Sequence, residues 1–453
     1  MKFKTLYTLL LIALLTSSCS AGIADTQQID DAPATQAEVK ESSDGRTPPD
    51  ESIEACTNLN EGDACEFTWE KGPETGLCET VESQLACSPE RSSGNESQSE
   101  QSESQSDDVN TEESQSTSTQ SVEIEGLVLI PAGEFEMGEH HDLGGLEHGN
   151  DEVPIHTVSI DSFSMATIET TNQQYVEFLN SAFIAGSIEV RDGDVYGTGG
   201  SEIYFQTSQS SQYSPIAWDG SNFTVLDNRD NHPVTSVRWY GSAAYTNWLS
   251  AQYGYEGCYD LLTWECDFTK SGFRLPTEAE WEYAGRGGLY EPYAIFPWGD
   301  DDDSSKANWP NSGDPYESGS QPWTTPVGFY DGQLHYKADF NWAGSQESYQ
   351  TSDGANGYGL YDMAGNTWEW VNDWYGRDYY AESPSDNPTG PDSGSPAPDG
   401  NTYHVVRGGN WYNGEWGHSR VSNRNLAHYR GPEDSSHPWY HFGFRIVLDA
   451  GTR

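Results

Sequence analysis

Hydrophobic side chains recur at helical spacing in only a few short stretches of the chain. In residues 172–180 the apolar positions are Tyr175, Val176, Phe178 and Leu179. This spacing is typical of a helix that turns one face to a protein core. The stretch is therefore predicted to be a short amphipathic helix.

Two further helices are predicted downstream. The first spans residues 240–250 and carries apolar side chains on or near one face, at Ala243, Ala244, Trp248 and Leu249. The second spans residues 276–284. There Thr277 is suited to cap the helix, and Glu280, three residues later, completes a capping box.

The rest of the C-terminal part shows little regular patterning. Residues 128–130 followed by 133–138 predict a β-hairpin. Elsewhere the sequence is rich in Gly, Trp and Tyr, and turn signals recur along long loops. We therefore predict one large α+β domain over residues 122–453, with little regular secondary structure. Metal ions and aromatic packing are the candidates for fixing its loops.

The first 19 residues have the composition of a targeting segment. Lys2 and Lys4 precede an apolar run, residues 6–15, that is too short to span a bilayer. Small residues before Cys19 match a loose lipobox, so residues 1–19 are interpreted as a lipoprotein signal peptide, with Cys19 acylated after cleavage. The alternative is ordinary secretion, in which Cys19 is lost with the peptide.

Two polar segments flank a small cysteine-bearing module. Residues 20–55 lack an apolar period and predict a disordered linker, and residues 88–121 predict a flexible acidic linker rich in Ser, Gln and Glu. Residues 56–87 predict a small β-rich module held by disulfides among Cys56, Cys65, Cys78 and Cys87. Three connectivities are open, and a zinc site is the rival explanation.

The net charge indicates which partners the chain can bind, and the remaining cysteines indicate the redox state of its compartment. The chain has 73 acidic and 21 basic residues, a formal net charge of -52. A polyanion gains nothing by displacing counterions from nucleic acid, so no nucleic-acid partner is expected. Hard cations are favoured instead. Cys258 and Cys266 predict a local disulfide, and with Cys19 set aside the cysteine number is even, as in an oxidising compartment.

Eight motifs follow one another along residues 124–450. They are Ile130–Gly133 with Met137-Gly138, Glu169–Tyr175, His232–Val234 with Val237, Arg274–Ala284, Pro297–Gly299, Gly357–Trp370, Arg407–Gly409 and Gly443–Arg445. In this order they resemble the formylglycine-generating enzymes, also called sulfatase-modifying factors. The resemblance implies a C-type-lectin-like fold.

The resemblance also implies two calcium sites, each built from loop oxygens. The first would use backbone oxygens of Ala364, Gly365 and Thr367 and the carboxylate of Glu369. The second falls on Asn308, Trp309, Asp314 and Tyr316. The alternative is that these side chains only satisfy the backbone of their loops. Calcium is the cofactor expected.

The family's copper site is altered in this sequence. Oxidases of the family bind Cu(I) through two cysteine thiolates shortly after the Arg-Gly-Gly motif, and those positions hold Asn413 and His418 here. The soft Cu(I) ion needs soft ligands, which Asn and His cannot replace. Copper is therefore not expected, and no catalytic residue is assigned.

A binding groove is predicted around the C-terminal motif instead. Exposed aromatic side chains are effective contacts for a peptide or a glycan. The candidate residues are Asn410, Trp411, Tyr412, Trp416, His418, Tyr429, Trp439 and His441. Core packing is the alternative for the aromatic ones. A second group, His140, His141, His148 and His156, either binds a divalent metal or belongs to a solvated surface loop.

Three functional hypotheses follow. The leading one is a lipid-anchored protein of the cell envelope, at the outer membrane or surface-exposed or secreted, whose calcium-stabilised domain binds a peptide or glycan without copper oxidase activity. The alternative is a metal-dependent oxidase, which forms formylglycine from a sulfatase cysteine or acts like the pyoverdine-maturation branch. The third is a purely structural envelope protein.

Overall fold

A computed structural model describes the chain in ten segments. They are residues 64–69, 72–81, 84–89, 124, 126–143, 151–288, 292–397, 400–412, 416–426 and 440–449. Of the predicted residues, Cys19, Cys56, His148, Asn413, Tyr429 and Trp439 lie outside this description, as do the side chains of Cys65, Cys78, Cys87 and Trp416. The chain divides into two units, residues 1–116 and 117–453.

The first unit contains one antiparallel sheet in the order β1-β2-β3. Its strands are β1 (Ala64–Trp69), β2 (Gly72–Val81) and β3 (Gln84–Pro89). They begin within residues 56–87, the segment for which the sequence predicts a small β-rich module, and β3 ends two residues beyond it. The backbone register places Cys78 directly opposite Cys87, and Cys65 opposite Gly76. The disulfide pairing in this unit stays a prediction.

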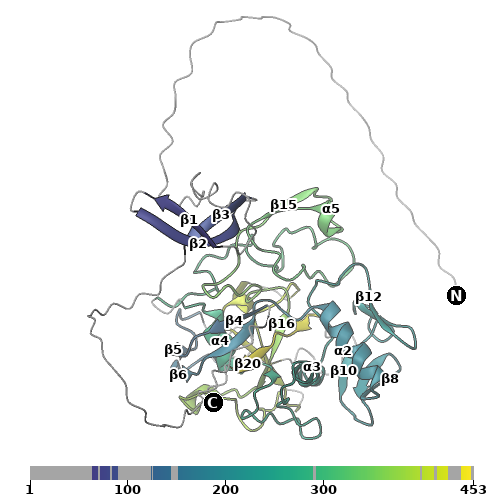
Figure 1. Cartoon of the computed structure of the whole chain (residues 1–453). Coiled ribbons are helices and arrows are strands. Elements are labelled where there is room, and N and C mark those ends of the chain that lie inside the picture. The colour runs from purple at the N-terminus through teal and green to yellow at the C-terminus, as the bar shows by residue number, and fades with distance from the viewer. Residues whose placement is uncertain are drawn as a thin grey trace, which may run out of the picture. The chain divides into compact units, whose positions relative to one another are not determined.

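The second unit holds the three predicted helices (Figure 1). The helical segments are α2 (Asn172–Ile184), α3 (Trp239–Gln252), α4 (Glu278–Gly285) and the short α5 (Lys337–Phe340), η1 (Tyr379–Ala381) and η2 (Trp416–Ser419). The capping box of α4 is confirmed, because the Thr277 hydroxyl accepts a hydrogen bond from the Glu280 amide at 3.1 Å and the Glu280 carboxylate accepts one from the Thr277 amide at 2.9 Å.

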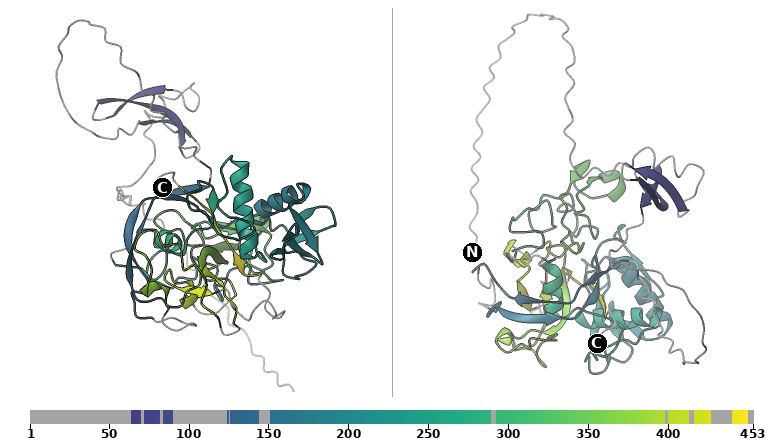
Figure 2. Two further views of the ribbon diagram at one scale, coloured as in Figure 1. Left: turned by 90° about the horizontal axis from the view of Figure 1, so that it is seen from below. Right: turned by 60° about the vertical axis from the view of Figure 1, so that its left-hand side comes forward.

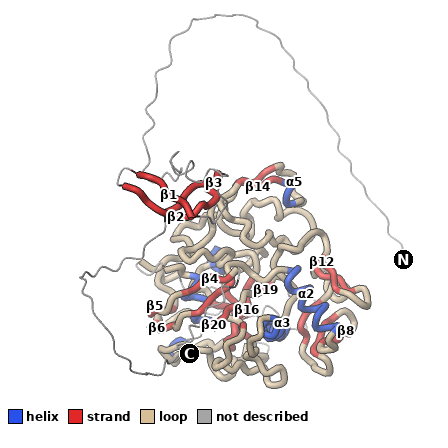
Figure 3. Tube along the Cα trace, in the orientation of Figure 1, coloured by secondary structure: helices blue, strands red, loops and turns tan. Residues whose placement is uncertain are grey.

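Short strands in several small sheets complete the second unit, and loops make up most of the rest (Figure 3). Two sheets have four strands, β13-β20-β7-β4 and β18-β17-β16-β19, one has the order β10-β9-β8, and three are two-stranded. The α+β class is thereby confirmed. The strands are β4 (Leu127–Ile130), β5 (Gly133–Met137), β6 (His156–Ile160), β7 (Phe163–Ala166), β8 (Ile188–Arg191), β9 (Asp194–Gly197), β10 (Ile203–Gln206), β11 (Ile216–Trp218), β12 (Phe223–Val225), β13 (Phe273–Arg274), β14 (Leu334–Tyr336), β15 (Ser348–Gln350), β16 (Trp368–Trp374), β17 (His404–Arg407), β18 (Arg424–Leu426), β19 (Phe442–Gly443) and β20 (Val447–Asp449).

The predicted hairpin at residues 128–138 is wrong. Strand β4 pairs with β7, and β5 pairs with β6, so the two neighbouring strands belong to different sheets. The connection between them is Pro131-Ala132. Tight two-residue hairpins need residues that tolerate positive φ, such as Asn or Gly, and this connection has neither. The chain therefore passes from one sheet to the next.

Two hydrophobic cores lie on either side of β16. One is formed by α2, α3 and the sheet β10-β9-β8, and it includes Trp368 and Trp370. Its helices lie side by side (Figures 1 and 2), with the rings of Phe178 and Tyr245 at 5.8 Å. The other core gathers Trp281 of α4 with side chains from β4 to β7, and it includes Val371. Successive residues of β16 thus reach both cores.

Buried ion pairs hold α4 to the rest of the domain. Glu278, Glu280 and Glu282 are all inaccessible to solvent. Glu280 takes two hydrogen bonds from Arg274 at 2.7 and 2.8 Å, and Glu278 takes two from Arg424 at 2.8 and 2.6 Å. Glu282 binds Arg286 at 2.6 Å and Arg407 at 2.5 Å. The acidic residues of this motif are therefore structural, and two of them, Glu278 and Glu282, bind Arg407 at the start of the Arg-Gly-Gly motif.

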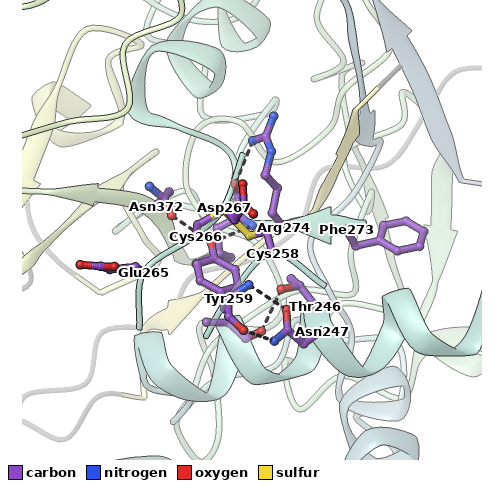
Figure 4. Close-up of a disulfide and its surroundings, with 12 residues drawn as sticks. Thr246, Asn247, Cys258, Tyr259, Glu265, Cys266, Asp267, Phe273, Arg274 and Asn372 are labelled. Atoms are coloured by element: carbon purple, nitrogen blue, oxygen red, sulfur yellow. Dashed lines mark hydrogen bonds between the residues drawn. A yellow bond between two sulfur atoms is a disulfide. The ribbon is translucent and has the colours of Figure 1, made fainter. Parts of the chain in front are cut away.

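The predicted disulfide between Cys258 and Cys266 is present, with the two Cα atoms 4.8 Å apart (Figure 4). It closes the loop that leaves α3. Asn247 of that helix holds the same loop, since its side chain donates to the Tyr259 carbonyl at 2.7 Å and accepts from the Tyr259 amide at 3.1 Å. No helix in the described part of the chain has the length and apolarity needed to cross a membrane.

Candidate functional site

Part of the predicted groove comes together as one aromatic cluster. Trp411 and Tyr412 follow β17, and His441 precedes β19. Their rings meet around Tyr440, with centroids at 5.6 Å for Trp411 and Tyr440, 5.9 Å for Tyr412 and Tyr440, and 6.1 Å for Tyr412 and His441. We call Trp411, Tyr412, Tyr440 and His441 the C-terminal aromatic cluster. Only Tyr412 is exposed, at 39%.

Two residues of this surface were not predicted. The ring of Tyr213 stacks on Tyr440 at 4.3 Å, and that of Trp323 lies 5.7 Å from Trp411. Both are far from the C-terminal motif in the sequence and come from loops without a local pattern. The rings thus come from four separate segments, which periodicity along one segment cannot indicate.

Backbone contacts connect the cluster to the loop of the first predicted calcium site. The Trp411 amide donates to the Asn366 carbonyl at 3.1 Å, and the Asn410 side chain accepts from the Tyr412 amide at 2.6 Å. The indole nitrogen of Trp411 is buried, and no acceptor for it exists among the described residues. Such N–H groups normally have a partner when buried.

The predicted groove residue His418 contacts a different ring. It is buried in η2, and its ring lies 6.1 Å from that of Trp368 in an edge-on arrangement. Gly409 packs tightly on the same segment, because a Cβ at that position would lie 2.4 Å from the Ser419 hydroxyl oxygen. The backbone φ of Gly409 is +75°, so this close approach requires glycine.

Glu369, the carboxylate predicted for the first calcium site, is saturated by protein donors. It accepts hydrogen bonds from Arg445 Nε at 2.7 Å, Arg445 Nη2 at 2.6 Å and the Trp281 indole at 2.7 Å. The buried Ala364, Gly365 and Thr367 lie in the turn before it. The Glu369 contacts argue against this carboxylate as a ligand, since its charge is already matched by a guanidinium.

Two further carboxylates lie close to this position and were missed. Glu169 accepts from the Asn366 side chain at 2.7 Å and from the Thr367 hydroxyl at 2.6 Å. Burial, with the negative charges of Asp362 and Glu369, raises the pKa of Glu169 well above its ordinary value. Burial raises the pKa of Asp362 to about 6. Both residues lie inside quoted motifs, but their convergence on Arg445 depends on the tertiary fold.

The second predicted calcium site has better oxygen ligands. Asp314 is buried and accepts only neutral donors among the described residues, namely the Ser312 hydroxyl at 2.6 Å, the Tyr330 hydroxyl at 3.3 Å and the Tyr316 amide at 2.7 Å. Burial raises its pKa to about 6. The side-chain oxygen of Asn308 is also buried and has no partner in the described part of the chain. A carboxylate without a cationic partner and an amide oxygen without a donor are both ligands that fit Ca²⁺.

Trp309 and Tyr316, the other two residues predicted for this calcium site, lie in the same loop. The Trp309 carbonyl accepts from the Ser312 amide at 3.0 Å, and the Tyr316 amide, two residues after Asp314, donates to the Asp314 carboxylate. Nowhere in the described segments do three or more His, Cys, Asp or Glu side chains gather as a metal site. A calcium ion at this loop would therefore depend on backbone and amide oxygens as well.

The histidine-rich loop gives no metal centre in its described part. His140 stacks on Tyr293 at 3.8 Å and bonds the Glu136 carbonyl at 2.9 Å. His141 lies 3.5 Å from the Glu139 carboxylate, whereas His156 bonds the Pro154 carbonyl at 3.1 Å. The three side chains thus have separate partners.

Comparison with known proteins decides the family. The model of the FGE-sulfatase family, the Sulfatase-modifying factor enzyme 1-like domain, matches residues 112–450. The chain belongs to this family. The formylglycine-generating enzyme of Streptomyces coelicolor is 29% identical over 344 residues, covering 72% of this chain and 90% of the enzyme.

Two other proteins are similar to this chain. The serine/threonine-protein kinase pkn1 of Chlamydia caviae is 30% identical over 287 residues, which cover 63% of this chain and 33% of the kinase. This chain therefore spans only a third of that relative's length. The solved structure of PvdO from Pseudomonas aeruginosa is 23% identical, with a TM-score of 0.42, covering 71% of this chain and 94% of PvdO.

The FGE-sulfatase domain of this chain does not contain a thiolate pair for copper. Residues 122–453 include two cysteines, Cys258 and Cys266, and these form the disulfide. A disulfide sulfur is not the thiolate that binds a metal. The donor set for a two-thiolate Cu(I) centre is therefore missing from this domain.

Proposed function

We propose that the protein is a binding member of the FGE-sulfatase family and not a thiolate-copper oxidase. The observation that carries the proposal is the cysteine content of the domain, because Cys258 and Cys266 are joined to each other and the two family copper positions hold Asn413 and His418. Neither Asn nor His supplies the soft sulfur ligands that Cu(I) requires. The proposal is that the chain retains the family's fold but has lost its thiolate-copper oxidase chemistry.

The ligand in this proposal is a peptide or a glycan at the C-terminal aromatic cluster. The exposed ring of Tyr412 supplies apolar contact area, and the buried indole N–H of Trp411 needs an acceptor that the described residues do not provide. Both peptides and glycans carry such oxygen acceptors. The proposal also includes a lipid anchor at Cys19 in the cell envelope, with the acidic linker holding the domain away from the membrane.

The oxidase alternative is tested on the purified full chain. The chain is incubated with copper, oxygen and a synthetic peptide carrying a sulfatase target cysteine, and the peptide is weighed by mass spectrometry. We expect the cysteine to stay unmodified while the Streptomyces coelicolor enzyme converts it. Copper-dependent conversion that disappears in His418→Ala would overturn the proposal.

The proposed ligand binding is tested on peptide and glycan arrays. We expect a ligand whose binding is lost in Tyr412→Ala and kept in Tyr336→Ala, since Tyr336 is another exposed tyrosine, in β14. Array signals that are the same in all three proteins would show that the C-terminal aromatic cluster is not the binding surface.

Calcium is proposed to stabilise the loop of Asn308, Trp309, Asp314 and Tyr316. At a Ca²⁺ concentration a hundredfold above the dissociation constant, the free energy of unfolding should rise by about 2.7 kcal/mol. Calorimetry with Ca²⁺ and with chelator measures the gain. Asp314→Asn should remove most of it, whereas Asp301→Asn, at an exposed position nearby, should keep it. A full gain in Asp314→Asn would place the ion elsewhere.

A further inference from the structure

A cavity of about 430 Å³ is lined in part by strand β16. Its walls come from four places in the chain: the start of β10, the start of α3, strand β16 and the residues leading into β17. Hydrogen bonds join two of them, because the Arg238 amide donates to the Tyr204 carbonyl at 2.9 Å. No residue of the C-terminal aromatic cluster lines this cavity.

Aromatic rings belong to half of the residues that line the cavity. Trp239, Tyr240, Trp370, Trp374 and Tyr403 all line it. The ring of His404 is stacked between two of them, at 3.8 Å from Trp239 and 3.8 Å from Trp374, with interplanar angles of 9° and 25°. We call this stack of Trp239, His404 and Trp374 the aromatic platform.

The histidine in the stack is uncharged at neutral pH. Burial lowers the pKa of His404 to about 3, and its Nδ1 donates to the Asn372 carbonyl at 2.9 Å. The platform thus carries no charge of its own. A ligand that packs against it gains contact area without meeting a cation at its centre.

The polar groups of the cavity are mixed in sign. Glu202 and Arg238 supply one negative and one positive charge, and Ser201, Asn401 and Thr402 add hydroxyl and amide groups that both donate and accept. Glu202 and the chain's net charge of -52 repel an anionic ligand, whereas Arg238 repels a cationic one. A wholly aliphatic ligand would leave these polar groups without partners. The lining therefore fits a ligand that is neutral, flat on one face and rich in hydroxyl groups.

We propose that this cavity binds a neutral saccharide, with one sugar ring packed on the aromatic platform. A pyranose has an apolar C–H face for Trp374 and its neighbours, and its hydroxyls can donate to Glu202 and accept from Arg238. The volume lies within the range of small-ligand pockets, which are mostly apolar with a few placed polar groups. The site is separate from the C-terminal aromatic cluster, so it does not depend on the ligand proposed there.

The experiment is calorimetric titration of the purified full chain with cellobiose, maltose, N,N′-diacetylchitobiose, a uronic-acid disaccharide and a tripeptide. We expect at least one neutral disaccharide to bind, and Trp374→Ala and Glu202→Ala each to weaken it by about tenfold or more. Trp218→Ala and Glu189→Ala are the matched controls, because both residues lie on other strands outside the cavity. Both should leave the affinity unchanged, as should Tyr412→Ala.

Several outcomes would overturn the proposal. One is that no neutral disaccharide titrates at up to about 10 mM, which exceeds the weak millimolar end of the affinity scale. Another is binding of only the acidic disaccharide or the tripeptide. A third is saccharide binding that Trp374→Ala and Glu202→Ala leave intact, which would assign it to another surface. Circular dichroism of each variant separates loss of binding from loss of fold.

Discussion

Replacing Arg445 by methionine is expected to lower the free energy of unfolding by about 3 to 5 kcal/mol, the effect of removing one partner of a buried ion pair. Arg445 is inaccessible to solvent and donates to both oxygens of Glu369, at 2.7 and 2.6 Å, and to the Ala166 and Tyr361 carbonyls. Without the guanidinium, Glu369 would remain buried beside Glu169 and Asp362. Urea unfolding of the wild type and the variant measures the difference.

Two control variants test whether the loss of stability comes from the unpaired buried charge. Arg191→Met removes a pair with Glu189 at 3.6 Å whose side chains are 45% and 42% exposed, and such surface pairs contribute about 0 to 1 kcal/mol. The double variant with Glu369→Gln should lose less than Arg445→Met alone, because no unpaired charge is left. Each measurement is repeated with Ca²⁺ and with chelator. An Arg445→Met effect as small as that of Arg191→Met would mean that the buried charges have another partner.

Local chemistry accounts for what the sequence predicted well. The capping box of α4 joins two residues three positions apart, so its geometry is contained in the helix itself, and Thr277 and Glu280 appear as predicted. The disulfide of Cys258 and Cys266 also closes a short loop. In contrast, β4 and β5 are neighbours in sequence but pair with β7 and β6, a choice made by the tertiary arrangement of two sheets.

The candidate sites show the same division. Glu369 was interpreted as a calcium ligand because its neighbours in sequence supply oxygens, but its partner Arg445 comes from a distant motif. Asp314 was placed by the resemblance, and two of its three contacts are local, with Ser312 and Tyr316 in one turn, while the third is with Tyr330. Tyr213 and Trp323 reach the C-terminal aromatic cluster from separate loops. Side chains whose environment is set by distant segments are those that the sequence could not assign.

Acidification is expected to destabilise the protein through two buried histidines. Burial lowers the pKa of His404 to about 3, and burial together with the positive charge of Arg229 lowers that of His232 to about 3. Between pH 6.5 and 3 the unfolded chain therefore binds protons that the folded protein excludes. Stability falls as the pH drops through this window, by about 1.4 kcal/mol per pH unit for each histidine.

Carboxylates with raised pKa make the protein more stable as the pH falls. The effect of His404 is therefore measured by comparing the slope of unfolding free energy against pH between variants. Asp314 and Asp362, with pKa values of about 6, take up protons more readily in the folded protein, which offsets part of the loss below pH 6. His404→Phe keeps a ring between Trp239 and Trp374 but removes the titrating group. Its unfolding free energy, measured by urea at pH 6, 5 and 4, should fall less steeply than that of the wild type by about 1.4 kcal/mol per pH unit.

The matched control for lost packing is Trp374→Phe, which weakens the stack on His404 without removing a titrating group. Its absolute stability should drop, because a smaller ring leaves part of the platform uncovered, yet its pH slope should equal that of the wild type. Linkage depends only on the difference in bound protons and not on the level of stability. If His404→Phe and Trp374→Phe share the wild-type slope, His404 titrates alike in the folded and unfolded chains, and the wall of the cavity is charged at acidic pH.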